Sequence, residues 1–165
     1  MADIILIAHN LRSAHNVGSL LRTADGIGVS KVLLSGYTPY PLANNDTRLP
    51  HLARKINSQI VKTSLGAETM ISWQHVLDLP SVIAQLKADG FRIVGLEQAT
   101  ESTPVNSFKT PEKIALIVGR EVEGLEPETI ALCDELVEIP MFGRKESFNV
   151  VQAAAMALYQ LRLVN

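Results

Sequence analysis

The fold is indicated first by the apolar run Ile4-Ile5-Leu6-Ile7-Ala8, which ends at the polar pair His9-Asn10. Short apolar runs rich in β-branched residues are typical of buried strands. In residues 17–27 the apolar positions keep the i, i+3, i+4, i+7 spacing of an amphipathic helix. Asn16 is well placed as the N-cap of that helix, and the glycines in residues 26–28 are well placed to end it.

The same alternation continues along the chain. Further strands are expected at residues 31–36, 91–96, 114–119 and 135–140, and further helices at residues 75–88 and 150–164. Residues 37–47 form a long loop, which a basic segment follows. Strands that alternate with helices predict one α/β domain over residues 1–165 with a largely parallel sheet.

The expected helix 150–164 is apolar around most of its circumference, with valines, leucines and a run of alanines. Such a helix must be covered on more than one side. In a domain of this size that requirement favours a partner subunit.

Composition excludes several classes of protein. The formal net charge is −2, so any contact with nucleic acid must be local rather than spread over the surface. A single cysteine, Cys133, and four scattered histidines argue against a disulfide scaffold and a metal site. The N-terminus has no secretion signal and no apolar run is long enough to span a membrane, so a cytoplasmic protein is expected.

Positive charge is concentrated in the first part of the chain. Residues 1–62 carry seven Lys and Arg against three Asp and Glu, whereas residues 63–165 carry eight against fourteen. A basic N-terminal surface is therefore compatible with the acidic total.

Ligands of open parallel sheets bind beyond the carboxyl ends of the strands, so the loops there are the places to search. In the first loop Arg22 follows Gly18 by four residues and shares its helix face. A guanidinium there could bind a phosphodiester. Alternatively, Asn16 only caps the helix, Gly18 only permits close packing and Arg22 is a solvated surface charge.

The second loop, residues 118–125, combines two glycines with several acids and matches neither common phosphate-binding motif. Its acids would repel a triphosphate, so a nucleoside-like ligand without phosphates fits better. The alternative is a glycine-ended strand followed by a helix with acids in its first turn.

The third loop, residues 139–150, leads into the last helix, where Ser147 or Asn149 is a reasonable N-cap. Ser147 lacks the glycine-flanked turn of a hydrolase nucleophile. Cys133 has no basic neighbour in sequence, and an inert, partly buried thiol is expected.

Together, these loops resemble the three motifs of the SPOUT superfamily, in particular its SpoU (TrmH-like) RNA 2′-O-ribose methyltransferases. The matching residues are Asn16, Gly18 and Arg22 in the first motif, Gly119-Arg120-Glu121 and Gly124-Leu125 in the second, and Ile139-Pro140-Met141 and Ser147-Phe148-Asn149-Val150 in the third. The resemblance covers nearly all of the chain.

The resemblance implies a parallel-sheet SPOUT fold with a C-terminal deep trefoil knot, a homodimer, and S-adenosyl-L-methionine (AdoMet) as the methyl donor. It implies cofactor binding by Leu96, Glu97, Gly119, Arg120, Gly124, Ile139, Met141, Ser147, Phe148, Asn149 and Val150. The implied catalytic residues are Arg22, Asn16, Glu121, Ser147 and Asn149, with no metal. Because the pKa of arginine lies above about 12, Arg22 is expected to clamp an RNA phosphate rather than to act as the base.

The RNA is either tRNA, slightly favoured, or rRNA, and its expected contacts lie in the basic first part of the chain: Arg12, Arg22, Arg48, Arg54 and Lys55. No accessory RNA-binding extension is expected. Many family members have glycine in place of Val122 and leucine in place of Phe148. Since valine disfavours a positive φ, the backbone of the second loop is expected to differ from the common form. Two alternatives are methylation of a base, and an RNA-binding homologue that has lost catalysis.

Overall fold

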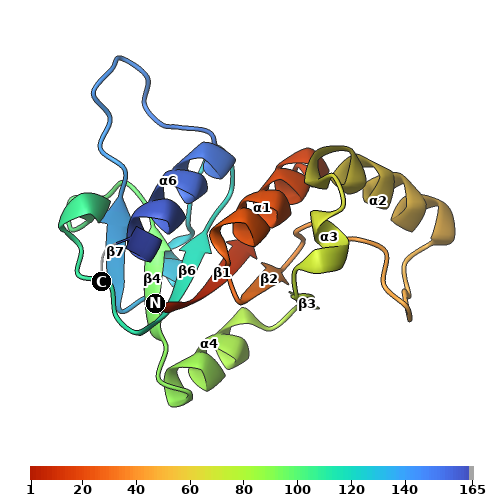
Figure 1. Ribbon diagram of the computed structural model, residues 1–165, viewed down its shortest axis with the longest axis horizontal. Coiled ribbons are helices and arrows are strands. Elements are labelled where there is room, and N and C mark those ends of the chain that lie inside the picture. The colour runs from red at the N-terminus through yellow and green to blue at the C-terminus, as the bar shows by residue number, and fades with distance from the viewer. Residues whose placement is uncertain (164–165) are drawn as a thin grey trace.

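Every strand pairing in the sheet is parallel. The computed structural model describes residues 1–163, and its seven strands lie in the order β3-β2-β1-β6-β4-β7-β5 (Figure 1). The strands are β1 (Asp3–His9), β2 (Lys31–Ser35), β3 (Trp73–Val76), β4 (Arg92–Leu96), β5 (Thr103–Pro104), β6 (Lys113–Val118) and β7 (Glu135–Glu138). The expected parallel α/β sheet is confirmed.

Helices cover both faces of this sheet. They are α1 (Ala14–Ile27), α2 (Pro50–Ser64), α3 (Ala67–Met70), α4 (Leu79–Ala88), α5 (Pro127–Ile130) and α6 (Val150–Leu163), with a 3₁₀ turn η1 (Val105–Ser107). Helices α1, α2 and α6 contribute to one hydrophobic core, and α4 with the segment around α5 contributes to the other. The molecule is therefore a three-layer α/β/α domain.

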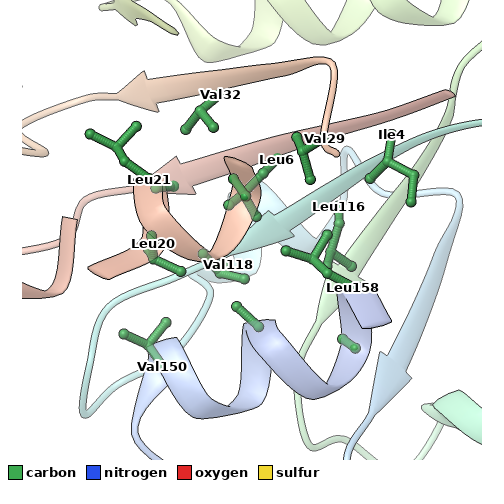
Figure 2. Close-up of a cluster of buried hydrophobic side chains, with 14 of the residues drawn as sticks. Ile4, Leu6, Leu20, Leu21, Val29, Val32, Leu116, Val118, Val150 and Leu158 are labelled. Carbon is green, nitrogen blue, oxygen red and sulfur yellow. The ribbon is translucent and has the colours of Figure 1, made fainter. Parts of the chain in front are cut away.

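The central strands supply both cores because successive side chains of a strand point to opposite faces. In β1, Ile4 and Leu6 belong to the core under α1 and α6, whereas Ile5 and Ile7 belong to the core over α4. Figure 2 shows the first of these cores, in which side chains of β1, β2 and β6 meet those of α1 and α6. The apolar run that begins the sequence is thus the centre of the molecule.

Helices α1 and α2 approach closely at Gly18. A Cβ atom on Gly18 would overlap the carbonyl oxygen of Ile60 and the hydroxyl of Thr63. The Thr63 hydroxyl donates to the carbonyl oxygen of His15, 2.8 Å away, and so joins the two helices directly. The glycine of the first motif is therefore required for packing.

Two expectations about elements are wrong, and one helix was not predicted. Helix α1 begins at Ala14, and its N-cap is Ser13 rather than Asn16, because the Ser13 hydroxyl accepts from the Asn16 N–H. The range 75–88 is not one helix: its start belongs to β3, and α4 begins only after the N-cap Asp78. Helix α2 falls in the basic segment, where no helix was expected. The last residue of the expected helix 150–164 lies outside the described residues.

None of the helices in residues 1–163 is both long enough and apolar enough to cross a membrane. In the same residues no three His, Cys, Asp or Glu side chains gather closely enough to hold a metal ion. Burial raises the pKa of the Cys133 thiol to about 11, which makes the thiolate scarce at neutral pH and agrees with the inert thiol expected.

Candidate active site

A cavity of about 280 Å³ lies beyond the carboxyl ends of β4, β6 and β7, beside the start of α6. Parallel strands place their carboxyl ends at one edge of the sheet, so the loops that follow them meet there. Of the expected site residues, the cavity wall contains Leu96, Glu97, Gly119, Arg120, Glu121, Gly124, Ile139, Ser147, Phe148 and Val150. Met141, Asn149, Asn16 and Arg22 are not among the lining residues.

The loop after β6 closes on itself. The N–H of Arg120 donates to the carbonyl oxygen of Gly124 at 3.2 Å, and the N–H of Gly124 donates back at 3.1 Å. A Cβ atom on Gly119 would lie 2.7 Å from the backbone of Gly124 and Leu125, so this closure requires glycine at 119. Val122 lies at the exposed tip, and its φ is not positive. The valine is therefore accommodated without backbone strain.

Glu97 fixes this loop to the end of β4. Its Oε2 accepts from the N–H of Leu125 at 2.7 Å, and its Oε1 accepts from the N–H of Gln98 at 3.0 Å. A Cβ atom on Gly124 would overlap the same carboxylate, and Gly124 has φ +71°. Gly124 is thus required both by its backbone conformation and by its carboxylate neighbour.

Glu121 connects the cavity to the N-terminus of α1. Its carboxylate accepts from the N–H groups of Arg12 and Ser13, at 3.1 and 3.0 Å, and from Nδ2 of Asn16, at 3.3 Å. Burial by itself would raise the pKa of Glu121, but these hydrogen bonds outweigh it and hold the pKa below its ordinary value. The side chain of Asn16 therefore acts as a hydrogen-bond donor to Glu121 and not as a helix cap.

The third loop, residues 139–149, is largely exposed and projects away from the sheet between β7 and α6 (Figure 1). Asn149 Oδ1 accepts from the N–H of Val151 at 2.9 Å, which supports the expected capping role at the start of α6. Ser147 lines the cavity with an exposed side chain. The side chain of Asn149 is thus engaged at the helix start, next to the cavity.

Arg22 lies apart from the cavity. It is exposed on α1, six residues beyond Asn16, which corresponds to about 9 Å along a helix. Within residues 1–163 its guanidinium has neither an ion pair nor a hydrogen bond. Its charge is therefore available to an external anion.

The other residues expected to contact RNA differ in whether their charges are already paired within the protein. Arg12 pairs with Glu123 at 2.6 Å on the surface. Arg48 is engaged inside the loop 36–49: it pairs with Asp46 and donates to the carbonyl oxygens of Tyr40 and Pro41. The sequence suggested that Arg48 is a free cation on the surface, whereas in the structure its charge is paired. Arg54 and Lys55 are exposed on α2.

Sequence reasoning missed a half-buried network beside the second loop. Asn10 Nδ2 donates to His9 Nε2 at 3.1 Å, so His9 Nδ1 carries the proton and donates to the buried Ser35 hydroxyl at 2.9 Å. Burial lowers the pKa of His9, against the opposing effect of Glu126, whose carboxylate lies 3.6 Å from Nε2. The position of His9 and Asn10 directly after β1 was the signal that could have found this network.

Arg120 links the network to the cavity. Its Nη1 lies 3.6 Å from Glu126, and its Nε is buried without an acceptor in the described part of the chain. The cavity wall otherwise carries five carboxylates: Glu97, Glu121, Glu123, Glu138 and Glu146. Such a wall disfavours phosphates and suits a ligand with positive charge, hydroxyl groups and one acceptor for Arg120.

The sequence model of the SpoU rRNA Methylase family matches residues 3–159. The 23S rRNA (guanosine-2′-O-)-methyltransferase RlmB of Neisseria meningitidis serogroup B is 32% identical over 159 residues, which are 96% of this chain and 58% of that protein. RlmB of Acinetobacter baylyi is 29% identical over 95% of this chain and 58% of its own length. The chain thus spans less than two thirds of the length of these relatives.

Solved structures show the same fold. The SpoU methyltransferase AviRb from Streptomyces viridochromogenes, in complex with AdoMet, superposes with a TM-score of 0.79 at 24% identity, over 98% of this chain and 60% of AviRb. The A. aeolicus TrmH/SpoU tRNA modifying enzyme superposes with a TM-score of 0.79 at 23% identity, over 98% of this chain and 75% of that one.

Proposed function

The chain belongs to the SpoU rRNA methylase family, and we propose that it transfers a methyl group from AdoMet to a ribose 2′-hydroxyl of RNA. The observation that carries this proposal is the gathering of the second and third motifs around one cavity at the strand ends. The first motif reaches the same place through the hydrogen bond between Asn16 and Glu121.

The residues around the cavity fit AdoMet. Its sulfonium and hydroxyl groups suit a wall of carboxylates, and its amino-acid carboxylate suits the buried Arg120 Nε, which has no acceptor among the described residues. We expect backbone groups at Leu96, Gly119, Ile139 and Met141 to bind the adenosine. When bound, AdoMet supplies an electrophilic methyl group.

This chain's own residues would act by binding and positioning. Arg22, with a guanidinium that stays protonated, would hold the phosphate next to the target ribose. Ser147 and Asn149, beside the cavity, would orient the ribose, and Glu121 would keep the start of α1 in place for Asn16. Catalysis would come mainly from orientation and from the exclusion of water.

We infer a homodimer from two features. Tyr159 and Leu163 of α6 are 60% and 62% exposed although α6 packs on the sheet through its opposite side. Arg22 does not reach the cavity of its own subunit, so Arg22 of the partner subunit would complete each site. Both features are accounted for if α1 and α6 form the contact between two copies.

We also propose that the segment from residue 139 onward forms a knot. The support is topological: β7 lies between the earlier strands β4 and β5, and α6 then returns to the N-terminal layer. There Arg162 Nη1 donates to the carbonyl oxygen of Ala2 at 2.6 Å. A strand that comes late in the chain but lies between earlier strands is the arrangement expected when the C-terminal segment passes through a loop formed by the earlier chain.

Incubation with radiolabelled AdoMet and RNA from cells that lack the gene tests the activity. We expect label in either tRNA or rRNA, at one nucleotide whose 3′ linkage resists alkali because its 2′-oxygen is methylated. Label in an alkali-labile nucleotide would indicate base methylation instead. AdoMet binding without label in any RNA pool would indicate a homologue that has lost catalysis.

RNA binding is expected to use the exposed charges of α2. Reversal of both charges in Arg54→Glu/Lys55→Glu should weaken RNA binding and flatten its dependence on salt, because fewer counterions are then released. Fluorescence anisotropy of labelled RNA at several salt concentrations measures both effects. The control Lys109→Glu reverses an exposed charge outside the N-terminal basic segment. Equal effects of the two variants would place the RNA elsewhere.

A further inference from the structure

A second cavity, of about 480 Å³, lies at the other end of the sheet from the candidate active site. Its walls are residues 42–47 of the long loop after β2, the side chain of Tyr40, and residues 73–75 of the edge strand β3. Between β3 and the strands of the active site lie β2 and β1 (Figure 1). With strands about 4.8 Å apart, the two cavities are separated by roughly 14–24 Å.

The loop wall of this cavity is held in place from within. Arg48 Nε donates to Asp46 Oδ1 at 2.8 Å, and its other nitrogens donate to the carbonyl oxygens of Tyr40 and Pro41. The N–H of Leu42 donates to Asn57 of α2 at 2.8 Å. The cavity is therefore formed before any ligand arrives, and the ion pair leaves Asp46 without an unbalanced charge.

Aromatic rings form the opposite wall. The Tyr40 ring lies between the Arg48 guanidinium, 3.6 Å from its centroid, and the His75 ring, 4.1 Å away and nearly parallel. The Trp73 ring lies 6.4 Å from Tyr40. Trp73 Nε1 donates to the carbonyl oxygen of Glu68, so its N–H is already used and only its ring is available to a ligand in the cavity.

The remaining groups at the cavity are neutral donors and acceptors. Asn44, Asn45 and Thr47 are exposed, and within residues 1–163 their side chains make no hydrogen bond. Strand β3 is at the sheet edge, so its outer peptide groups are unpaired by other strands. A rigid pocket with an aromatic wall, amide and hydroxyl groups and no unbalanced charge matches the chemistry of a nucleobase.

We propose that this cavity binds one unpaired nucleobase of the RNA, several nucleotides from the methylated ribose. The proposal rests on the proposed function for its RNA substrate. Both faces of Tyr40 are already covered, so stacking on the Trp73 ring supplies affinity. Asn44, Asn45 and Thr47 contact the edge of the base. The exposed Arg54 and Lys55 of the neighbouring helix α2 would bind the phosphates on either side.

Trp73 is the only tryptophan in the chain, so all tryptophan fluorescence comes from the wall of this cavity. The test titrates the full chain with short single-stranded RNA oligonucleotides of each base, excited at the red edge of the tryptophan band, where nucleotides absorb little. An abasic oligonucleotide of the same length is the matched probe with phosphates but no bases. We expect saturable quenching by at least one base-containing oligonucleotide and none by the abasic one or by AdoMet.

The variant Asn44→Ala/Asn45→Ala/Thr47→Val changes only exposed side chains and keeps Trp73. We expect it to raise the Kd for the quenching oligonucleotide by about fivefold to a hundredfold, the range expected for loss of side-chain contacts to a base edge. The control Asn106→Ala removes an exposed asparagine of η1 and should bind normally. Thermal unfolding of both variants should match that of the unchanged chain.

Two results would overturn the nucleobase subsite: quenching by the abasic oligonucleotide as strong as by the others, or binding of the oligonucleotides by anisotropy without any change at Trp73. AdoMet binding, measured by calorimetry, and methyl transfer are separate readouts. Methyl transfer without a Trp73 response refutes the subsite alone, whereas base-dependent quenching without methyl transfer supports the subsite and refutes the activity.

Discussion

Gly119 shows how one missing side chain shapes the cavity. In Gly119→Ala the new Cβ would lie 2.7 Å from backbone atoms that cannot move independently, so the loop 119–124 must open. We expect at least a tenfold loss of AdoMet affinity by calorimetry, and destabilisation of about 1–3 kcal/mol, as is usual for overpacking.

The matched control for this change is Gly143→Ala. Gly143 lies in the exposed third loop, where an added Cβ would meet no atom within 4 Å. This variant should bind AdoMet and unfold like the unchanged chain. Equal behaviour of the two variants would mean that the closed form of the loop is not needed for the cofactor.

Arg22 is the residue at which binding and chemistry can be separated. Because it is exposed and does not line the cavity, Arg22→Ala should leave folding and AdoMet affinity nearly unchanged. Methyl transfer in single-turnover assays at saturating RNA should fall by about a hundredfold or more if the guanidinium acts in the transition state.

Arg92→Ala is a suitable comparison for Arg22→Ala. Arg92 is also exposed, and its pair with Glu135 at 2.9 Å is a surface ion pair of small energetic value. That variant should transfer methyl groups normally. An undiminished rate in Arg22→Ala would remove the main reason for assigning catalysis to α1.

At the scale of elements, the start of α1 depends on a carboxylate from another part of the chain. Glu121 has a lowered pKa in the folded protein, so its charged form stabilises the fold above its unfolded pKa of about 4.5, and that contribution is lost as the pH falls through the lower folded value. Glu121→Gln should therefore reduce the free energy of unfolding at pH 7 by about 0.5–1 kcal/mol, a modest value because the group is partly exposed.

Urea unfolding at a series of pH values measures this effect. The difference between Glu121→Gln and the unchanged chain should shrink below about pH 4.5, where the carboxylate of the unfolded chain becomes protonated first. Glu101→Gln replaces an exposed loop carboxylate and provides the reference. A difference that is constant with pH would show that the amide perturbs packing and that charge is not the cause.

The elements were predictable where one pattern dominates and not where signals compete. The all-apolar run of β1 clearly indicates a strand, and the glycine after α1 indicates where that helix ends. In α2 the helical spacing of Ala53, Ile56 and Ile60 is present, but charged and polar residues around it obscured the period. In residues 75–88 the apolar residues suited a helix throughout, and the Asp78-Leu79-Pro80 start signal marks where it begins.

The site was predictable to the extent that it depends on strand ends. The second and third motifs meet because β6, β4 and β7 are parallel neighbours. The sequence predicts the parallel sheet, whereas the order of its strands is known only from the structure. The internal ion pair of Arg48 depends on the conformation of a long loop, and the contact of Glu121 with Ser13 joins residues far apart in sequence. Contacts of that kind arise only once the chain has folded.

At the scale of the whole molecule, we propose that the exposed side of α6 forms the contact between two copies of the chain. We expect the chain to run as a dimer in size-exclusion chromatography with light scattering. Tyr159→Glu places a charge on a side chain that is already 60% exposed, so the subunit should fold while the dimer dissociates. Methyl transfer should fall with it, since Arg22 of the partner subunit would be lost from each site.

Leu77→Glu is the corresponding control. Leu77 is 82% exposed between β3 and α4, away from α1 and α6, and a charge there should leave the dimer intact. A monomeric unchanged chain that still methylates RNA would contradict the shared site.

The central position of β1 also affects how the protein is made. Its partners β2 and β6 flank it, but β6 leaves the ribosome roughly 100 residues after β1, so one edge of an apolar strand stays open during most of synthesis. Open apolar edges pair readily with other chains. The nascent protein is therefore most prone to aggregation before its second half emerges, and chaperones that shield β1 would raise its yield.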